Sequence, residues 1–121
     1  MSPFRSRRQR VVSRALLCFG VALLALASPA GPPSTATKPK TRTVVLRGMN
    51  FLPATVTVNL GDTVIWKNED VVPHTATSRN KSFDSGNIDP GGSWSYVANK
   101  KGTHPYVCAY HPNSRGRLVV R

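Results

Sequence analysis

The sequence predicts an all-β domain, either an antiparallel sandwich or a small barrel. From residue 43 to the last residue, short runs rich in Val, Thr, Ile and aromatic residues alternate with turn signals about 8–12 residues apart. No window in this part shows the periodicity of an amphipathic helix. The roughly 80 residues available can bury one small hydrophobic core, so we expect a single domain.

The expected strands are short and follow one another closely. Each is rich in β-branched or aromatic residues, and most end at a cluster of Gly, Pro, Asn or Asp. The clearest turns are Gly61-Asp62, Asp89-Pro90-Gly91-Gly92 and Asn99-Lys100-Lys101-Gly102. In chain order, the expected strands are 43–46, 54–58 (preceded by Phe51-Leu52-Pro53), 63–66, 74–77, 93–97, 103–108 and 117–120, with a segment broken by Gly, Asp and Asn over 83–88.

The start of the chain differs from the rest and predicts a signal peptide over residues 1–30. Five arginines and no acidic residue precede residue 15, an almost wholly apolar run follows over 15–27, and Ala25-Leu26-Ala27 has the form of a cleavage site. The apolar run is about 13 residues long, short of the ~20 that a membrane-spanning helix needs, so an uncleaved membrane anchor is the less favoured alternative. Residues 31–42, rich in Pro, Thr and Lys, predict a flexible linker, and residues 43–121 the folded domain. We therefore expect a periplasmic or extracellular protein with no stable membrane span after cleavage.

The charge balance favours acidic partners. After residue 30 the chain carries 12 basic and 5 acidic residues, a net charge of +7. Such a surface attracts acidic proteins or anionic surfaces, although it also serves as an ordinary solvated surface. The basic residues are scattered and form no basic helix or aromatic-basic ladder, so no nucleic-acid binding is expected.

Cys108 is the only cysteine after residue 30. In an exported chain it is a free thiol, half of an intermolecular disulfide or a metal ligand, and the exposure of a free thiol to oxidation favours the metal. His111 follows three residues later across a Pro/Asn/Gly-rich loop, and His74 lies 34 residues upstream of Cys108. One thiolate and two imidazoles form the set that copper prefers in electron-transfer sites. His104 would lie roughly 13 Å from Cys108 along an extended strand, so we exclude it from the site.

A series of motifs with characteristic order and spacing runs through the predicted domain. They are Phe51-Leu52-Pro53, the run from Val56 to Asn68, Asp70-Val71-Val72-Pro73-His74-Thr75, Phe83-Asp84-Ser85-Gly86, Pro90-Gly91-Gly92-Ser93, the run from Gly102 to Cys108, and His111-Pro112. In these motifs the chain resembles the cupredoxins, the blue type 1 copper proteins, and is most similar to their amicyanin/plastocyanin-like branch. The resemblance covers residues 43–121 and implies a Greek-key β-sandwich with one copper ion, cycling between Cu(I) and Cu(II), at one end. The ligands that it implies are His74, Cys108 and His111.

One position departs from the family pattern. The family's loop has the form Cys-x-x-His-Pro-x-Met, in which the methionine supplies the axial ligand, whereas Ser114 stands at that position here. Serine has less reach than methionine, so we expect Ser114 not to bind copper and the axial position to be empty or filled by water. The amide oxygen of Asn113 is a less favoured alternative. The axial ligand tunes the reduction potential, so this position decides much of the site's chemistry.

The resemblance implies a mobile electron carrier, and we expect a monomer that exchanges electrons through the edge of His111 with a transient, acidic redox partner. The alternative is a copper carrier, buffer or sensor without electron transfer, which the missing methionine favours. We do not expect an enzyme. A nucleophilic Cys108 would require an oxyanion hole and a catalytic carboxylate, and the sequence shows no clear sign of either.

Overall fold

The structure is a computed structural model that describes residues 20, 22, 24–33 and 35–121. Most of the predicted signal peptide, residues 1–19, 21 and 23, lies outside the described residues. Residues 35–121 form one compact unit, and the described residues before Thr41 carry no strand or helix. Within the described part of the chain, no helix has the length and apolar character needed to cross a membrane.

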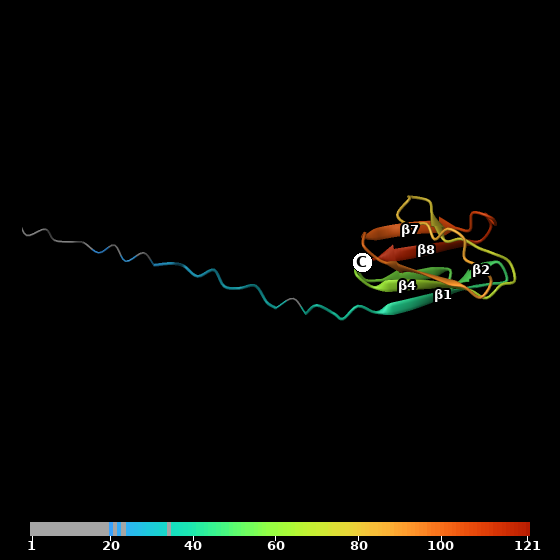
Figure 1. The fold of residues 1–121 in the computed structure, drawn as a ribbon. Coiled ribbons are helices and arrows are strands. Elements are labelled where there is room, and N and C mark those ends of the chain that lie inside the picture. Colours follow the sequence, from blue (N-terminus) through green and yellow to red (C-terminus); the bar gives the residue numbers. More distant parts are fainter. Residues whose placement is uncertain (1–19, 21, 23, 34) are drawn as a thin grey trace, which may run out of the picture. The chain divides into compact units, whose positions relative to one another are not determined.

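Two four-stranded sheets form a sandwich, which Figure 1 shows as two layers with β7 and β8 in one and β1 and β4 in the other. The first sheet has the order β2-β1-β4-β6 and the second β3-β8-β7-β5. The strands are β1 (Thr41–Arg47), β2 (Asn50–Leu52), β3 (Thr55–Val58), β4 (Thr63–Asn68), β5 (Thr77–Ser78), β6 (Ser93–Val97), β7 (Gly102–Val107) and β8 (Arg115–Val120). The all-β sandwich expected from the sequence is therefore confirmed.

The sheets are mixed rather than purely antiparallel. β1 pairs with β4 and β3 pairs with β8 in parallel, whereas the other four pairings are antiparallel. The reason is the order in which the chain visits the two layers. After β2 the chain crosses to the second sheet for β3 and returns for β4, so β4 runs beside β1 in the same direction.

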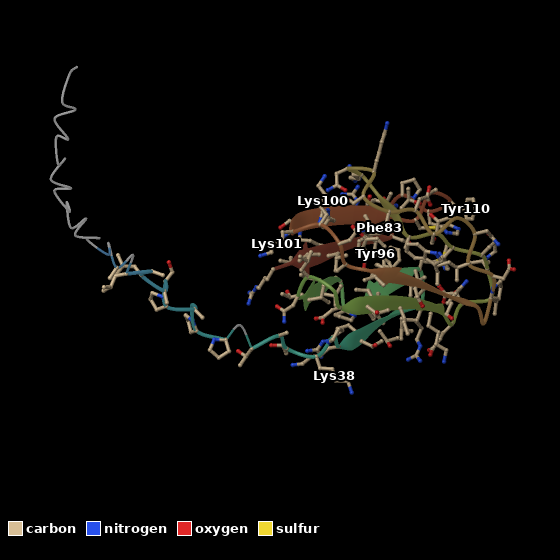
Figure 2. The ribbon with its side chains drawn as sticks, turned by 60° about the vertical axis from the view of Figure 1, so that its left-hand side comes forward. Lys38, Phe83, Tyr96, Lys100, Lys101 and Tyr110 are labelled. Atoms are coloured by element: carbon tan, nitrogen blue, oxygen red, sulfur yellow. The ribbon has the colours of Figure 1, made fainter. Side chains whose placement is uncertain are left out.

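The core lies between the sheets and is dominated by aromatic rings. Trp66 on β4 and Tyr106 on β7 are almost fully buried and meet edge to face, with ring centroids 5.5 Å apart. Figure 2 labels Phe83 and Tyr96, whose ring centroids lie 4.9 Å apart at the side of this cluster. Aromatic side chains bury large areas, so these rings supply much of the hydrophobic stabilisation of a small domain.

Tyr106 also fixes the spacing of β7 and β8. Its ring lies over Gly116, where an added Cβ would stand 2.2 Å from the ring carbon Cζ. The hydroxyl has no hydrogen-bond partner among the described residues, and burial raises the pKa of Tyr106 to about 12. Tyr106 is thus a packing residue, held two residues before Cys108.

The expected strand over 74–77 is wrong for most of its length. His74 forms a single bridge with Ile88, through His74 N–H to Ile88 O at 3.1 Å and Ile88 N–H to His74 O at 2.7 Å, and β5 begins only at Thr77. His74 therefore lies in a short irregular segment between β4 and β5 and is anchored by its own backbone.

Candidate metal centre

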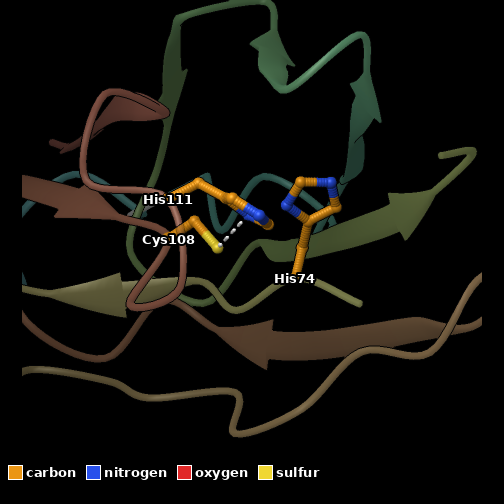
Figure 3. Close-up of side chains that lie close together, drawn as sticks. All are labelled: His74, Cys108 and His111. Carbon is orange, nitrogen blue, oxygen red and sulfur yellow. Dashed lines mark hydrogen bonds between the residues drawn. The ribbon is translucent and has the colours of Figure 1, made fainter. Parts of the chain in front are cut away.

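The structure brings His74, Cys108 and His111 together at one end of the sandwich. One potential ligand atom from each residue lies within 4.8 Å of those from the other two. Figure 3 shows the three side chains converging, and the dashed line marks the 3.5 Å contact between Cys108 Sγ and His111 Nδ1. His74 and Cys108 are fully buried, whereas His111 is partly exposed.

The loop that carries Cys108 and His111 is closed by its own backbone. His111 N–H donates to Cys108 O at 3.2 Å, Ser114 N–H donates to His111 O at 2.8 Å, and Cys108 N–H donates to Ser114 O at 3.0 Å. These bonds connect the end of β7 to the start of β8 and turn the chain back on itself. They explain how a gap of two residues places the imidazole beside the thiol.

His74 is oriented by Asp70. The Asp70 carboxylate accepts a hydrogen bond from His74 Nε2–H at 2.8 Å, and it also accepts the N–H groups of Gly48 at 2.6 Å and Met49 at 2.9 Å. Burial alone would raise the pKa of Asp70, but these three hydrogen bonds outweigh it and lower the pKa, so the carboxylate is charged at neutral pH. An ionised carboxylate only accepts, so the proton of the neutral imidazole lies on Nε2.

The other nitrogen of His74 is left for a ligand. Nδ1 then carries a lone pair, is buried and has no hydrogen-bond partner among the described residues. A buried polar atom without a partner costs free energy, so such an atom calls for an explanation. A metal ion bound by His74 Nδ1, Cys108 Sγ and His111 Nδ1 would satisfy it, and a carboxylate on the far nitrogen is the usual companion of a metal-binding histidine.

Thr75 joins the two segments that carry the three side chains. Its N–H donates to Cys108 Sγ at 3.3 Å, and its hydroxyl accepts the N–H of Ala109 at 2.8 Å. An N–H directed at sulfur stabilises a thiolate, the form of cysteine that binds metals. The roles of Asp70 and Thr75 were not expected from the sequence, although both lie within the motif Asp70-Val71-Val72-Pro73-His74-Thr75.

The three residues fit a metal ion of soft or borderline character, because the set combines a thiolate with two imidazoles. Bonds of about 2.0 Å to nitrogen and 2.3 Å to sulfur, as zinc makes, separate ligand atoms by roughly 3–4 Å, which is close to the spacing here. Two imidazoles and one thiolate also form the trigonal set typical of copper electron-transfer sites. The donor set and the unpartnered Nδ1 of His74 thus both indicate a site for such a metal ion.

Ser114 is buried beside the cluster, but its hydroxyl is directed elsewhere. It donates to the backbone oxygen of Met49, in the turn between β1 and β2. A surface hollow of about 550 Å³ lies next to this contact and is lined by Gly48, Met49, Asn50, Tyr110, His111, Pro112, Asn113 and Ser114. The proton of the Ser114 hydroxyl is therefore engaged by Met49 O, and the Ser114 backbone closes the loop that carries Cys108 and His111.

His104 lies outside the cluster and has structural partners. Its Nδ1 contacts Asn80 Nδ2 at 2.8 Å and Ser82 Oγ at 2.9 Å, and its Nε2 donates to Lys100 O at 2.8 Å. Both ring nitrogens are satisfied, and the ring is buried. His104 is therefore a buried residue with hydrogen-bond partners of its own, apart from the three clustered side chains.

Comparisons with known proteins agree with this geometry. A family model described as a cupredoxin-like domain matches residues 16–120. The chain is 28% identical over 95 residues to amicyanin from Paracoccus versutus, which covers 74% of this chain and 72% of the relative. It is 27% identical over 82 residues to amicyanin-alpha from Methylorubrum extorquens, which covers 64% of this chain and 69% of the relative.

Solved structures show the same likeness. A point mutant of amicyanin in the Cu(I) state superposes with a TM-score of 0.63 at 26% identity, over 67% of this chain and 82% of the other. A purple cupredoxin from Nitrosopumilus maritimus superposes with a TM-score of 0.62 at 26% identity, over 66% of this chain and 99% of the other.

Proposed function

The chain belongs to the cupredoxin-like family, and on that premise we propose that it is an exported one-electron carrier that binds one copper ion through His74, Cys108 and His111. One observation carries the proposal. The buried Nδ1 of His74 has no partner among the described residues, and it shares a cluster with a buried thiol and a second imidazole. Metal ligation is the interaction that such a set lacks.

Each residue around the cluster has a separate task. Asp70 keeps the proton of His74 on Nε2, so that Nδ1 is free to bind. The Thr75 N–H stabilises negative charge on Cys108 Sγ. Copper, when bound, supplies the Cu(I)/Cu(II) couple. Because the ligands are held by hydrogen bonds and by the closed loop 108–114, they move little when the charge of the site changes, which favours fast electron exchange.

Electron exchange is assigned to the exposed edge of His111. His111 is partly exposed, and its neighbours Tyr110 and Pro112 are exposed, so a partner can approach the imidazole from solvent. The other two cluster residues are buried. The protein is a monomer that meets its redox partner transiently, and its net positive charge after residue 30 suits an acidic partner.

The second candidate is a copper carrier, buffer or sensor without electron transfer. The observation that favours it is Ser114, which donates to Met49 O and offers no thioether to copper. Loss of that ligand could slow electron exchange and leave affinity intact. An enzyme with a nucleophilic Cys108 fits less well for two reasons. The sulfur is fully buried, so a substrate would have little access to it. The sulfur contacts His111, whereas the Asp70 carboxylate is bound to His74, so Asp70 does not orient the histidine that the sulfur contacts.

Voltammetry of the copper-loaded chain separates these functions. The carrier requires one copper per chain and a reversible one-electron wave. Bound copper without such a wave would instead support the copper carrier, buffer or sensor. His111→Ala is expected to lose the wave, whereas Tyr110→Ala, at the exposed neighbouring position, is the matched control and should retain it.

A further inference from the structure

A groove lined by three arginines crosses the outer face of the β3-β8-β7-β5 sheet. It has a volume of about 500 Å³, and Arg79, Arg115 and Arg117 are its only charged lining residues. We call it the arginine groove and propose that it binds clustered carboxylates on an acidic redox partner. The inference rests on the proposed electron-carrier function, because it names the surface at which the partner docks.

The sheet itself places the three arginines together. Arg117 on β8 pairs with Pro105 on β7, and Arg115 pairs with Val107. Residues paired across neighbouring strands point to the same face, and the residues that alternate with them, including Tyr106 and Leu118, point into the core. Arg79 follows β5 directly, and its N–H donates to Pro105 O at 2.8 Å.

None of these arginines forms an ion pair with a carboxylate among the described residues. The ion pairs among the described residues involve Arg47, Lys67 and His74, and the only acids in them are Glu69 and Asp70. The remaining acids are engaged by other groups: Asp62 by the N–H groups of Lys40 and Asn59, Asp84 by Thr77 and the Gly86 N–H, and Asp89 by Asn87. Three unpaired positive charges around one groove repel one another, and a docked anion would relieve that repulsion.

The groove fits a protein surface better than a nucleic acid. Its lining combines the exposed Pro105 and the half-buried Val107 with the three arginines, and a mixture of apolar side chains and arginine is common at protein interfaces. Guanidinium groups bind carboxylates through two parallel hydrogen bonds. The only aromatic lining residue, Tyr106, is buried in the core, so the groove lacks a ring on which bases could stack.

The groove adjoins the segments that carry two of the metal-centre residues. Val107 in its lining is joined to Cys108 by one peptide bond. Arg115 Nε donates to Pro112 O at 3.3 Å, in the loop that carries His111. A partner held in the arginine groove would therefore lie beside both the strand and the loop that supply ligand residues.

The test uses fluorescently labelled hexaglutamate as the probe and the full chain, both metal-free and copper-loaded, at low ionic strength. Anisotropy gives the affinity, and ¹H–¹⁵N NMR spectra give the location. We expect shifts at Arg79, Val107 and Arg117, and an affinity at least about tenfold weaker in the variant Arg79→Gln/Arg115→Gln/Arg117→Gln. Labelled hexalysine should not bind.

The matched control removes the same charge elsewhere, in Lys38→Gln/Lys100→Gln/Lys101→Gln. Figure 2 shows Lys100 and Lys101 at the end of the domain away from Tyr110. The control should weaken binding by less than about threefold. Equal weakening in both variants, shifts centred on Lys100, or no binding of hexaglutamate would overturn the proposal. Because the metal-free protein is also titrated and the arginine variant should keep its copper, failure of the groove and failure of copper binding give different results.

Discussion

Asp70→Asn is expected to weaken copper binding by about 10–100-fold. The carboxylate accepts three hydrogen bonds, one of them from His74 Nε2–H, and an amide retains only one acceptor oxygen. Removing a hydrogen bond to a charged group costs about 1.5–3 kcal/mol, and each 1.4 kcal/mol is a factor of about ten in affinity. His74 Nε2–H and the Met49 N–H both donate to Oδ2, and the Gly48 N–H donates to Oδ1, so an amide nitrogen at either position meets an N–H donor. The range corresponds to the loss, or the weakening by a neutral acceptor, of the bond that fixes the His74 ring.

The assay is a competition titration with a chromophoric Cu(I) chelator. Glu69→Gln is the matched control, because it removes the same charge from the neighbouring residue, whose carboxylate contacts Arg47 and Lys67. Its affinity should change by less than about twofold, as expected for an exposed ion pair. NMR of the metal-free protein gives a second readout, since the His74 proton should lie on Nε2 in the wild type and be shared between both nitrogens in Asp70→Asn. Unchanged affinity together with an unchanged tautomer would refute the reasoning.

Three further predictions concern packing, pH and the fourth ligand position. Gly116→Ala should lower the free energy of unfolding, measured in urea, by about 1–3 kcal/mol, because the new Cβ meets the Tyr106 ring, and a change near zero would contradict that packing. Burial raises the pKa of Tyr106 to about 12, so the stability that it contributes is complete below pH 10 and is lost as the pH rises from 10 to 12. Between pH 10 and 12 the free energy of unfolding of Tyr106→Phe should therefore fall by roughly 2–3 kcal/mol less than that of the wild type. Identical pH profiles of urea unfolding for the two proteins would count against this prediction. Ser114→Met should keep copper bound and shift the reduction potential in voltammetry, because position 114 lies beside the cluster and an axial thioether tunes the couple, and an unchanged potential would show that position 114 does not face the metal.

The three cluster residues could be predicted from the sequence because their chemistry is distinctive and local. Cys108 is the only cysteine after residue 30, and His111 follows it across a short loop. His74 was harder to place, since the strand expected around it does not form and a single bridge to Ile88 holds it instead. Its selection rested on the combination of one cysteine after residue 30, two suitably placed histidines and an all-β pattern, and the family resemblance implied the same ligand set.

The supporting residues could not be predicted because their roles depend on contacts between distant segments. Asp70 follows the strand expected over 63–66, and its local sequence gives no sign that it receives N–H groups from the turn at Gly48 and Met49, about 20 residues away in sequence. The parallel pairing of β1 with β4 was missed for the same reason, since alternation along a strand predicts which side chains are buried but not which strand is the neighbour. The burial of Trp66 and Tyr106 is easier to explain from the sequence, because both lie on strands with clear apolar patterns.

The most direct test of the copper site is the absorption and EPR spectrum of the Cu(II)-loaded chain, recorded for the wild type and for Cys108→Ser. Cys108 Sγ is fully buried in the cluster, so a thiolate-to-copper charge-transfer band should give the wild type an intense visible colour. Cys108→Ser should lose that band even where copper still binds the two histidines. An intense band that survives in Cys108→Ser, or a wild type without one, would contradict the assignment of the thiolate as a copper ligand.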